Sequence, residues 1–533
     1  MYLIFFKKII LIVILSTSIF SQIPEKRIVA EWEPALGTMI RWPLGIPSSL
    51  VGELARDDVI YVLVETNNQQ NQALNTFNNL GINLNNVIFI YTETYSHWTR
   101  DHGPQFIIGE EYWKVVNQRF NGYPEESGCQ LSINNNQLDS GNNYEGRPIL
   151  GLFRGWEEDD DTNLDFAAQM DWDVQNLPLY LTGGNFMTDG YGTGFSTELI
   201  VNENNLTESQ FKDTVYEYLN IDTYHIFDNP NVSSIQHIDC LAKLVDSETI
   251  IIKQVSPSSP EYECIEDFAN SFYSLNTINE RPFEIHRILC PEINGGSWEL
   301  NPVAAYTNSL ILNNKVLVPQ YGIPEDIQAI RVYEQAMPGY NVIGFNDNIN
   351  NPWYSEDALH CRTMGVFDPS MMHIYHKSIR QNEILNNQSV ELSAEIIDYG
   401  NLDTQFNSVT VHWKYSAEDG PFGQFLLTDE PGNIFRGSFP ALNQNSGIDY
   451  FITATNSSGN SISHPINGWH SFITLEQIFG DVNADNDINV QDIILVVNII
   501  LNNLDFNQVA DMNQDNEVNV YDIILIVNII LNR

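Results

Sequence analysis

Hydrophobic positions follow two alternating periods along the first two thirds of the chain. Short runs of Val, Ile and Leu between polar breaks predict strands: "DDVIYVLVE" from Asp57, "NVIFIYTE" from Asn86, "TIIIKQV" from Thr249 and "SLILNNKVLVP" from Ser309. The stretches "QQNQALNTFNNL" from Gln69 and "PEDIQAIRVYEQAM" from Pro324 carry apolar residues at helical spacing. Strands that alternate with helices predict an α/β unit over residues 27–373.

The pattern changes at about residue 374. The stretches "SVELSAEIIDYG", "SVTVHWKYS", "NIFRGSFPAL" and "DYFITATNSSGNSISHP" alternate polar and apolar residues and are separated by turn residues. Because about one hundred residues of this kind are typical of an immunoglobulin-like fold, we expect an all-β sandwich over residues 374–475.

A duplicated segment lies in residues 480–533. "DVNADNDINVQDIILVVNIILN" from Asp481 recurs as "DMNQDNEVNVYDIILIVNIILN" from Asp511. In each copy, the side-chain oxygens and one backbone carbonyl occur at the spacing of a loop that wraps around a hard cation such as calcium. The predicted ligands are Asp481, Asn483, Asp485, Asp487, Asn489 and Asp492, then Asp511, Asn513, Asp515, Glu517, Asn519 and Asp522. The segment resembles a type I dockerin, a small all-α calcium-binding module, and this resemblance implies a cohesin-type partner.

Composition and charge restrict the class of protein. The chain has 533 residues, of which 43% are hydrophobic and 11% aromatic, which indicates a globular protein of several domains. Lys and Arg number 24 against 69 Asp and Glu, so the formal charge of −45 disfavours nucleic acid and anionic membranes as partners. The charge permits cationic substrates, although the solvated acidic surface of a secreted protein explains it equally well.

The N-terminal residues predict export. Lys7 and Lys8 precede a short apolar run over residues 9–15, and small residues follow, as in a signal peptide over residues 1–21. The run is short for a membrane span of about 20 apolar residues. We therefore expect a secreted or cell-surface-attached protein without a membrane span after cleavage. Export permits disulfides, and five cysteines leave at least one thiol, for which Cys361 is the candidate.

Candidate chemistry centres on the stretch "EDALHCRTMG", which contains Cys361. A cysteine hydrolase needs a thiolate, a histidine that moves protons and groups that orient the electrophile. His360 would point away from the thiol if this segment were extended. If "IQHIDCL" is a strand, His237 and Asp239 share one face and Cys240 packs on the other.

Five motifs occur in the order found in guanidino-group-modifying enzymes. They are "WTRDHGP", "TGGNFMTDG", "IQHIDCLAKL", "TNSLILN" and "LHCRTMG". Together they resemble the bacterial peptidylarginine deiminases of the Porphyromonas type, with agmatine deiminases as cousins in the same superfamily. The resemblance implies a five-bladed, pseudo-symmetric α/β propeller with its active site on the central axis, followed by the sandwich.

The resemblance also implies roles for individual residues. They are Cys361 as nucleophile, His237 as general acid/base, Asp101 and Asp239 as the carboxylates that grip the guanidinium, Asn308 as an active-site amide and Trp98 as a pocket wall. Arg154 is the best local candidate for an arginine that binds the substrate's C-terminal carboxylate, and a plain surface loop is the alternative for its Gly- and Asp-rich stretch. The implied reaction passes through a covalent Cys-thiouronium and needs no cofactor. Two carboxylates would raise the pKa of the thiol, and the incoming cation, or a protonated His237, would offset this effect.

Several readings of function remain open from the sequence. Export favours arginine in peptides or proteins, converted to citrulline and ammonia, and the alternative is agmatine, converted to N-carbamoylputrescine and ammonia. A cysteine protease could use Cys361 and His237, but paired carboxylates suit a cation, whereas peptide hydrolysis needs an oxyanion hole. A protein that only binds is disfavoured because all the catalytic residue types are present.

Overall fold

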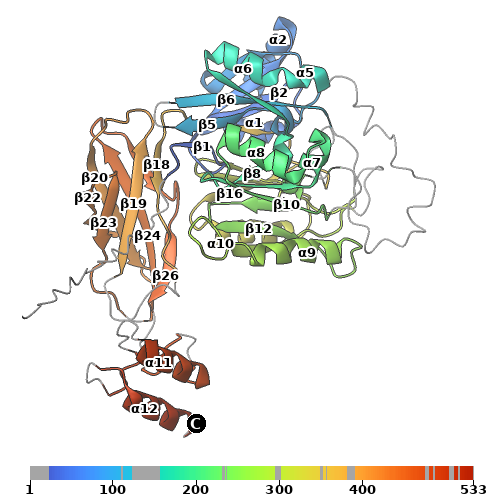
Figure 1. The fold of residues 1–533 in the computed structure, drawn as a ribbon. Coiled ribbons are helices and arrows are strands. Elements are labelled where there is room, and N and C mark those ends of the chain that lie inside the picture. Colours follow the sequence, from blue (N-terminus) through green and yellow to red (C-terminus); the bar gives the residue numbers. More distant parts are fainter. Residues whose placement is uncertain are drawn as a thin grey trace, which may run out of the picture.

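The structure is a computed structural model. It describes residues 23–109, 112–122, 156–230, 235, 237–294, 302–347, 352–355, 357–380, 390–443, 445–474, 479–483, 487–502, 509–513 and 517–531. These residues form an α/β unit, a region of two β-sheets and a pair of C-terminal helices (Figure 1). Within them, no helix has both the length and the apolar character needed to cross a membrane. The expected signal peptide, Arg154, Asp485 and Asp515 lie outside the described residues.

Five small sheets with one shared pattern make up the described α/β unit. Each sheet contains an antiparallel pair that is extended by a parallel strand. The sheets are β1 (Lys26–Ile28), β5 (Gln105–Gly109), β6 (Tyr112–Arg119) and β7 (Val174–Tyr180); β10 (Thr223–Phe227), β9 (Thr193–Thr197) and β8 (Met187–Thr188); β11 (Ala242–Leu244), β12 (Thr249–Gln254) and β13 (Glu284–Leu289); β14 (Leu310–Leu312), β15 (Lys315–Gln320) and β16 (Asn341–Asn346); and β17 (Met364–Phe367), β2 (Ala35–Arg41), β3 (Val59–Val64) and β4 (Val87–Tyr91). The pairing of β17 with β2 joins the two ends of the unit.

Helices lie in the connections between strands, mostly between the parallel ones. They are α1 (Ser48–Asp57), α2 (Asn67–Leu80), α3 (Thr99–His102), α5 (Trp156–Asp160), α6 (Thr162–Met170), α7 (Leu199–Asn204), α8 (Glu208–Leu219), α9 (Tyr262–Tyr273) and α10 (Asp326–Ala336), with the 3-10 turns η1 (Leu84–Asn86), η3 (Gly183–Asn185) and η4 (Ile238–Cys240). The two helices expected from periodicity are confirmed as α2 and α10. α2 begins where the Thr66 side chain accepts from the Gln69 amide, and it ends at Gly81, whose φ is 71°.

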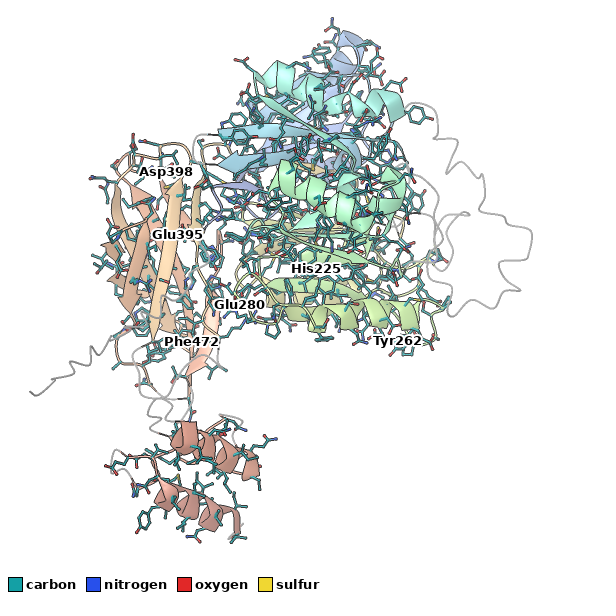
Figure 2. The ribbon with its side chains drawn as sticks, in the orientation of Figure 1. His225, Tyr262, Glu280, Glu395, Asp398 and Phe472 are labelled. Atoms are coloured by element: carbon teal, nitrogen blue, oxygen red, sulfur yellow. The ribbon has the colours of Figure 1, made fainter. Side chains whose placement is uncertain are left out.

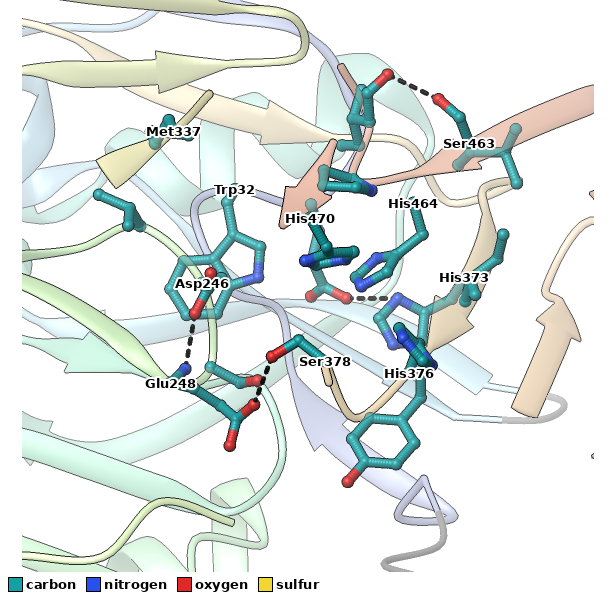
Figure 3. A pocket seen from close by; sticks show the side chains of 18 of the residues that line it. Trp32, Asp246, Glu248, Met337, His373, His376, Ser378, Ser463, His464 and His470 are labelled. Carbon is teal, nitrogen blue, oxygen red and sulfur yellow. Dashed lines mark hydrogen bonds and ion pairs between the residues drawn. The ribbon is translucent and has the colours of Figure 1, made fainter. Parts of the chain in front are cut away.

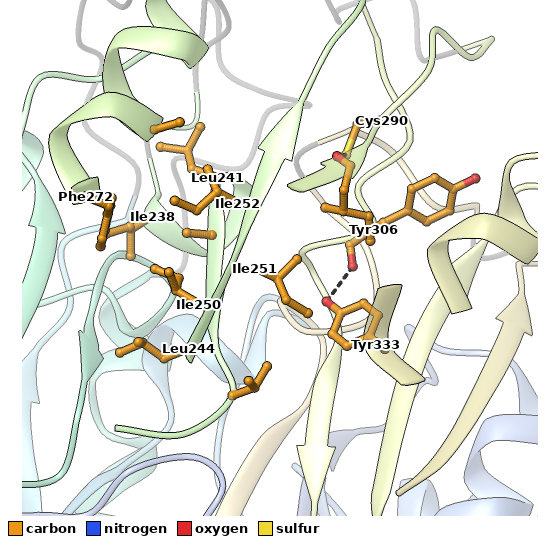
Figure 4. Close-up of a cluster of buried hydrophobic side chains, with 14 of the residues drawn as sticks. Ile238, Leu241, Leu244, Ile250, Ile251, Ile252, Phe272, Cys290, Tyr306 and Tyr333 are labelled. Carbon is orange, nitrogen blue, oxygen red and sulfur yellow. Dashed lines mark hydrogen bonds between the residues drawn. The ribbon is translucent and has the colours of Figure 1, made fainter. Parts of the chain in front are cut away.

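A hydrophobic core supports the segments before and after β12. Ile250, Ile251 and Ile252 of β12 are fully buried and pack with Phe272 of α9 (Figure 4). On the neighbouring sheet, the Tyr333 hydroxyl of α10 donates to the Tyr306 carbonyl at 2.9 Å. The core therefore fixes the backbone next to residues 237–241 and 306–309, which carry predicted site residues.

The β-rich region after the α/β unit consists of two antiparallel sheets that pack face to face. One contains β18 (Met372–Tyr375), β19 (Glu391–Asp398), β23 (Ile434–Ser438) and β22 (Thr428–Glu430), and the other contains β21 (Gly423–Leu426), β20 (Phe406–Tyr415), β24 (Ser446–Asn456), β25 (Ser461–His464) and β26 (His470–Thr474). Ile396 of the first sheet and Val411 and Ile452 of the second share one core. Because β18 already pairs with β19, Met372 and His373 belong to this region rather than to the α/β unit.

Polar contacts join the sheets of this region to the α/β unit. The Arg281 guanidinium donates to the Ser378 carbonyl and hydroxyl, both at 2.8 Å. Glu280, next to Arg281, lies at the edge of the α/β unit that faces β19, which carries Glu395 (Figure 2). The two units are therefore held together by hydrogen bonds as well as by apolar packing.

A pocket between these two units gathers four histidines. His373, His376, His464 and His470 line it together with Trp32 (Figure 3). Burial lowers the pKa of His376 to about 4, and burial together with the charges of His376 and His373 lowers that of His464 to about 3. Both rings are therefore neutral at pH 7.

The duplicated segment adopts the same local structure twice. Asp492 accepts hydrogen bonds from the amides of Val482 (2.7 Å) and Asn489 (2.8 Å), and Asp522 accepts from those of Met512 (2.8 Å) and Asn519 (2.8 Å). The two helices that follow are α11 (Val490–Asn502) and α12 (Val520–Leu531), which pack through the fully buried Val496 and Ile526. Each carboxylate thus ties its loop to the first turn of a helix.

Candidate active site

The predicted catalytic groups of two separate segments converge around Gly184 of a third segment. A Cβ atom built on this glycine would lie 2.6 Å from Asp101 Oδ1, 2.9 Å from His237 Nδ1 and 3.1 Å from Asp239 Oδ2. Asp101 comes from α3, His237 and Asp239 from the start of η4, and Gly184 from η3. Two carboxylates and an imidazole therefore meet at a point that glycine leaves open.

Asn308 places the thiol beside these groups. Its Nδ2 lies 3.2 Å from Cys361 Sγ and 3.2 Å from Asp239 Oδ2, and its Oδ1 accepts from the Cys361 amide at 3.2 Å. The Arg100 amide of α3 donates to the Cys361 carbonyl at 3.1 Å. Cys361 is thus hydrogen-bonded, directly or through Asn308, to both segments that carry the catalytic carboxylates. The sequence motifs predicted these residues but not their arrangement in space.

The Cys361 thiol has a raised pKa. A hydrogen bond with the Cys240 side chain acts to lower it, but burial and the negative charges of Asp239, Asp101 and Asp357 raise the pKa of Cys361 to about 11. This agrees with the expectation that the carboxylates oppose thiolate formation. Cys361, Cys240 and Cys290 are thiols, whereas Cys264 is in a disulfide.

His237 is a neutral base in the substrate-free site. Burial lowers its pKa to about 4, although the charge of Asp239 acts in the opposite direction. Its Nδ1 lies 3.7 Å from Asp101 Oδ1. The ring is therefore uncharged near pH 7, so the condition under which His237 would offset the carboxylates is not met, and the incoming cation is the other source of that offset considered from the sequence.

The two carboxylates are buried in the way that a cation-binding site requires. Asp101 is 2% exposed and Asp239 is 4% exposed. The Gly184 amide donates to Asp101 Oδ1 at 3.1 Å, and the pKa of Asp239 is lowered because a hydrogen bond and the charge of His360 outweigh burial. A planar guanidinium offers paired N–H donors to such carboxylates.

Three local expectations are corrected by the structure. "IQHIDCL" is not a strand, because residues 238–240 form η4, yet His237 and Asp239 still reach the same site. Cys240 does not pack on an opposite face, since its Sγ lies 3.5 Å from Asp239 Oδ1. The segment of His360 and Cys361 is a turn rather than extended, and both side chains reach the same oxygen: His360 Nδ1 lies 2.7 Å and Cys361 Sγ 3.8 Å from Asp239 Oδ2, a contact of His360 that sequence reasoning missed.

The remaining predicted substrate-binding residues have different outcomes. Trp98 is 7% exposed, precedes α3 and lies with its ring 5.1 Å from that of His97. Its place next to the helix that carries Asp101 is compatible with a pocket wall. Arg154 and the residues around it lie outside the described residues. Within the described residues, no group of three or more His, Cys, Asp or Glu side chains has the arrangement of a metal site.

A buried thiol, a neutral imidazole and two buried carboxylates around one open point define a thiol hydrolase for a cationic amidine group. A family profile described as Porphyromonas-type peptidyl-arginine deiminase matches residues 27–366. The chain belongs to this family. It is therefore a deiminase, a hydrolase of C–N bonds in linear amidines, and the reaction of this family needs no cofactor.

Relatives and solved structures agree with this assignment. A protein of Enterococcus faecalis described as an agmatine deiminase is 26% identical over 295 residues, which cover 50% of this chain and 73% of the relative. A Porphyromonas gingivalis structure described as an arginine deiminase aligns with a TM-score of 0.52 at 20% identity, over 64% of this chain and 98% of that chain. The agmatine deiminase structure of Enterococcus faecalis also aligns at 0.52 and 20%, over 64% and 96%. The structural likeness establishes the shared deiminase fold.

Adding one methyl group at Gly184 is expected to reduce activity. Gly184→Ala would place a carbon 2.6 Å from Asp101 Oδ1 and 3.1 Å from Asp239 Oδ2, where the substrate cation is expected. We expect kcat/KM to fall about 10- to 100-fold, because small displacements of reacting groups are costly, while the melting temperature changes little. Gly52→Ala is the matched control, since a Cβ on Gly52 of α1 meets nothing within 4 Å. Equal activity in both variants would place the substrate elsewhere.

The raised pKa of Cys361 predicts how its alkylation depends on pH. Because only the thiolate reacts and the pKa is about 11, inactivation by a neutral haloacetamide should rise about tenfold per pH unit from pH 8 to 10. The measurement is residual deiminase activity against time at each pH, with Cys361→Ala showing the background labelling of other thiols. A plateau of the rate near pH 8 would show an ionised thiol in the free enzyme and contradict this picture.

Proposed function

We propose that this deiminase hydrolyses the guanidinium of arginine in peptides or proteins, giving citrulline and ammonia. The observation that carries the proposal is the convergence of Asp101, His237 and Asp239 around Gly184, beside a thiol held by Asn308. Two carboxylates can each accept paired N–H bonds from one guanidinium and hold its plane and charge as the carbon is attacked. A neutral amide substrate would leave both buried charges without a partner.

The residues suggest the following steps. Substrate charge compensates Asp101 and Asp239 and lowers the barrier to ionising Cys361, whose proton passes to the neutral His237. The sulfur forms a bond to the guanidinium carbon, and His237 donates its proton to the departing nitrogen, which leaves as ammonia. The thiouronium that remains on Cys361 is then attacked by water, from which His237 takes a proton. Collapse breaks the S–C bond and releases the ureido product and the thiol.

Agmatine is the second candidate substrate. The Enterococcus faecalis relative and the Enterococcus faecalis structure reported above are both described as agmatine deiminases, and agmatine carries the same guanidinium on an alkyl chain that ends in an amine. Export, as predicted from residues 1–21, supports peptides and proteins instead, and the acidic composition suits either cation. The test is ammonia and ureido-product formation from agmatine, free arginine and peptides with internal or C-terminal arginine. A kcat/KM highest for agmatine would replace the proposal.

We also propose that the five sheets form a five-bladed α/β propeller and that the β-rich region is immunoglobulin-like. The repeated antiparallel-then-parallel pattern and the closure of β17 onto β2 support the propeller. Under this arrangement, each catalytic segment would come from a different blade and face the common axis. The antiparallel sheets with a shared core support the second assignment.

The C-terminal module is proposed to bind calcium and to dock onto a cohesin-type partner. Asp481, Asp492, Asp511 and Asp522 are buried at 6%, 0%, 2% and 0% exposure, and buried carboxylates in pairs suit a hard cation. Matching positions on the two helices leave apolar side chains exposed, namely Val490 (61%) and Leu501 (75%) on α11 and Val520 (60%) and Leu531 (76%) on α12. Such exposed apolar residues support a docking surface.

Calcium removal is expected to affect the C-terminal module and to spare catalysis. If calcium saturates each loop about 100-fold above its Kd, chelation should cost about 2.7 kcal/mol of stability for each of the two loops. The measurement is protease resistance of residues 480–533 and ureido-product formation in the same sample, with and without a chelator. Asp522→Ala should remove the calcium effect on the second loop, whereas Tyr521→Ala, a 70% exposed neighbour, should keep it. Loss of deimination on chelation would point to a calcium site in the α/β unit.

A further inference from the structure

His360 and Glu31 form a chain of ionic contacts behind the catalytic carboxylate. His360 Nδ1 lies 2.7 Å from Asp239 Oδ2, and His360 Nε2 lies 2.6 Å from Glu31 Oε2. Ionised carboxylates only accept hydrogen bonds, so a ring held between two of them is placed to donate from both nitrogens. His360 and Asp239 are each 4% exposed, and the Glu31 side chain is 17% exposed.

Three elements of the α/β unit hold Glu31 in place. Lys243 of β11 contacts its two oxygens at 3.1 and 3.3 Å, and Arg100 of α3 contacts Oε2 at 3.3 Å. The Ile311 amide of β14 donates to Oε1 at 3.0 Å. Glu31 is therefore a fixed anchor, and two carboxylates share this cluster with two cationic side chains and His360.

The same cluster determines how Asp239 is presented to a substrate. Oδ2 accepts from His360, from Asn308 Nδ2 at 3.2 Å and from the Cys361 thiol at 3.8 Å, and Oδ1 accepts from the Cys240 thiol at 3.5 Å. Oδ2 is also the oxygen nearest the Gly184 position, 3.1 Å from a Cβ built there, so the bonds from His360 and Asn308 fix the oxygen that lies at the open point of the site. Rotation of the carboxylate would break the 2.7 Å bond to His360.

We propose that His360 and Glu31 are a positioning pair, in which His360 ties Asp239 to the anchored Glu31 and holds this carboxylate in the orientation and charge state that bind the substrate cation. The proposal rests on the deiminase function, since it concerns the carboxylate that grips the cation. Neither residue touches the substrate or the reacting atoms. His360 acts through Asp239, and Glu31 acts through His360.

The charge balance explains why both members of the pair are needed. Burial raises the pKa of Asp239, and the hydrogen bond and charge of His360 more than offset it. The other groups around Asp239 are His237, Asp101, Lys243 and the Cys361 and Cys240 thiols, of which only Lys243 is a cation. Without Glu31, His360 would lose the acceptor of its Nε2 contact and its tie to the anchored cluster, and Asp239 would lose a fixed partner.

The test compares Glu31→Gln and His360→Gln with Glu33→Gln. Glu33 lies two residues from Glu31 in the same loop and is also buried and ion-paired, but its partners are Arg27 (2.8 Å) and His373 (2.9 Å). We expect kcat/KM to fall about 10- to 100-fold in the first two variants, the loss typical of a residue that orients a ligating group. Asp239 would take up a proton at higher pH in these variants. The acidic side of the pH profile of kcat/KM, called the acid limb below, should therefore shift to higher pH by about one unit or more. Glu33→Gln should lower the melting temperature and leave that limb unchanged.

Two further measurements separate positioning from a merely structural role. The first is the rate of inactivation by a cationic haloacetamidine divided by the rate of inactivation by a neutral haloacetamide. This ratio measures how strongly the site favours a cation, and it needs no turnover. We expect it to fall in both test variants. The ratio can be measured even if none of the proposed substrates is hydrolysed. A failure of the substrate assignment can therefore be told apart from a failure of the positioning proposal. The second is the addition of imidazole to the His360→Ala variant. The cavity lined by Glu31, Asp239 and position 360 would admit imidazole, which should restore activity. An unchanged acid limb and an unchanged ratio in both Gln variants would overturn the proposal.

Discussion

Cys361→Ala is expected to abolish ammonia release from every guanidino substrate and to leave the fold intact. The thiol forms the covalent bond, and no other described side chain at the site is a comparable nucleophile: Cys240 lies on Asp239 Oδ1 rather than beside Asn308. Removing the nucleophile of a covalent hydrolase costs at least about 10⁴-fold in kcat. The melting temperature should change by only a few degrees, because the side chain is small. The measurement is ureido-product formation at saturating substrate together with a thermal melt.

Cys290→Ala provides the matched control for this experiment. Cys290 is also buried, and burial likewise raises its pKa to about 11, but it lies in the hydrophobic core beside β12 rather than at the site. It should keep near wild-type turnover. Residual activity of Cys361→Ala above a few per cent, with Cys290→Ala inactive, would mean that the nucleophile has been assigned wrongly.

Asp101→Asn and Asp239→Asn are each expected to lose most activity. An amide keeps the shape of the carboxylate, but it removes a buried charge that pairs with the substrate cation and presents an N–H donor toward it. Breaking one side of a buried charge pair costs about 2–5 kcal/mol, which corresponds to about 30- to 5,000-fold in kcat/KM. The same variants should also lower the pKa of Cys361, because both carboxylates raise it.

This second effect gives the prediction two independent readouts. Deiminase kinetics should show the loss, whereas alkylation of Cys361 by a neutral haloacetamide at pH 8 should become faster. Asp58→Asn is the control, since this buried carboxylate of the α/β unit pairs with Lys315 at 3.0 Å and not with the site. Normal kinetics in either catalytic variant would assign that aspartate to structure alone.

The family and most of the catalytic residue types could be predicted from the sequence. Asp101, His237, Asp239, Asn308 and Cys361 each lie in a short motif, and the motifs keep their order along the chain. The structure brings these residues together, and the family match over residues 27–366 supports the class of reaction. The helices α2 and α10 were also predictable, because helical periodicity is a local property of the sequence.

The partner of His360 could not be predicted in the same way. Glu31 and His360 are 329 positions apart, and "AEWEP" carries no spacing that points to a site. An extended segment was a reasonable assumption for residues 237–241, but the turn η4 replaces it and brings Cys240 onto Asp239. Short polar segments have weak intrinsic preferences, so packing decides their conformation.

The sequence by itself determined the residue types, the order of the motifs, the change from α/β to β periodicity and the duplicated loops, because each depends on neighbours within a few positions. Only the tertiary structure decided the charge states of the site. His237 is neutral, Asp239 is anionic and Cys361 is a protonated thiol because burial and charges from distant segments act on each of them. These effects depend on distances through space, which the order of residues along the chain does not contain.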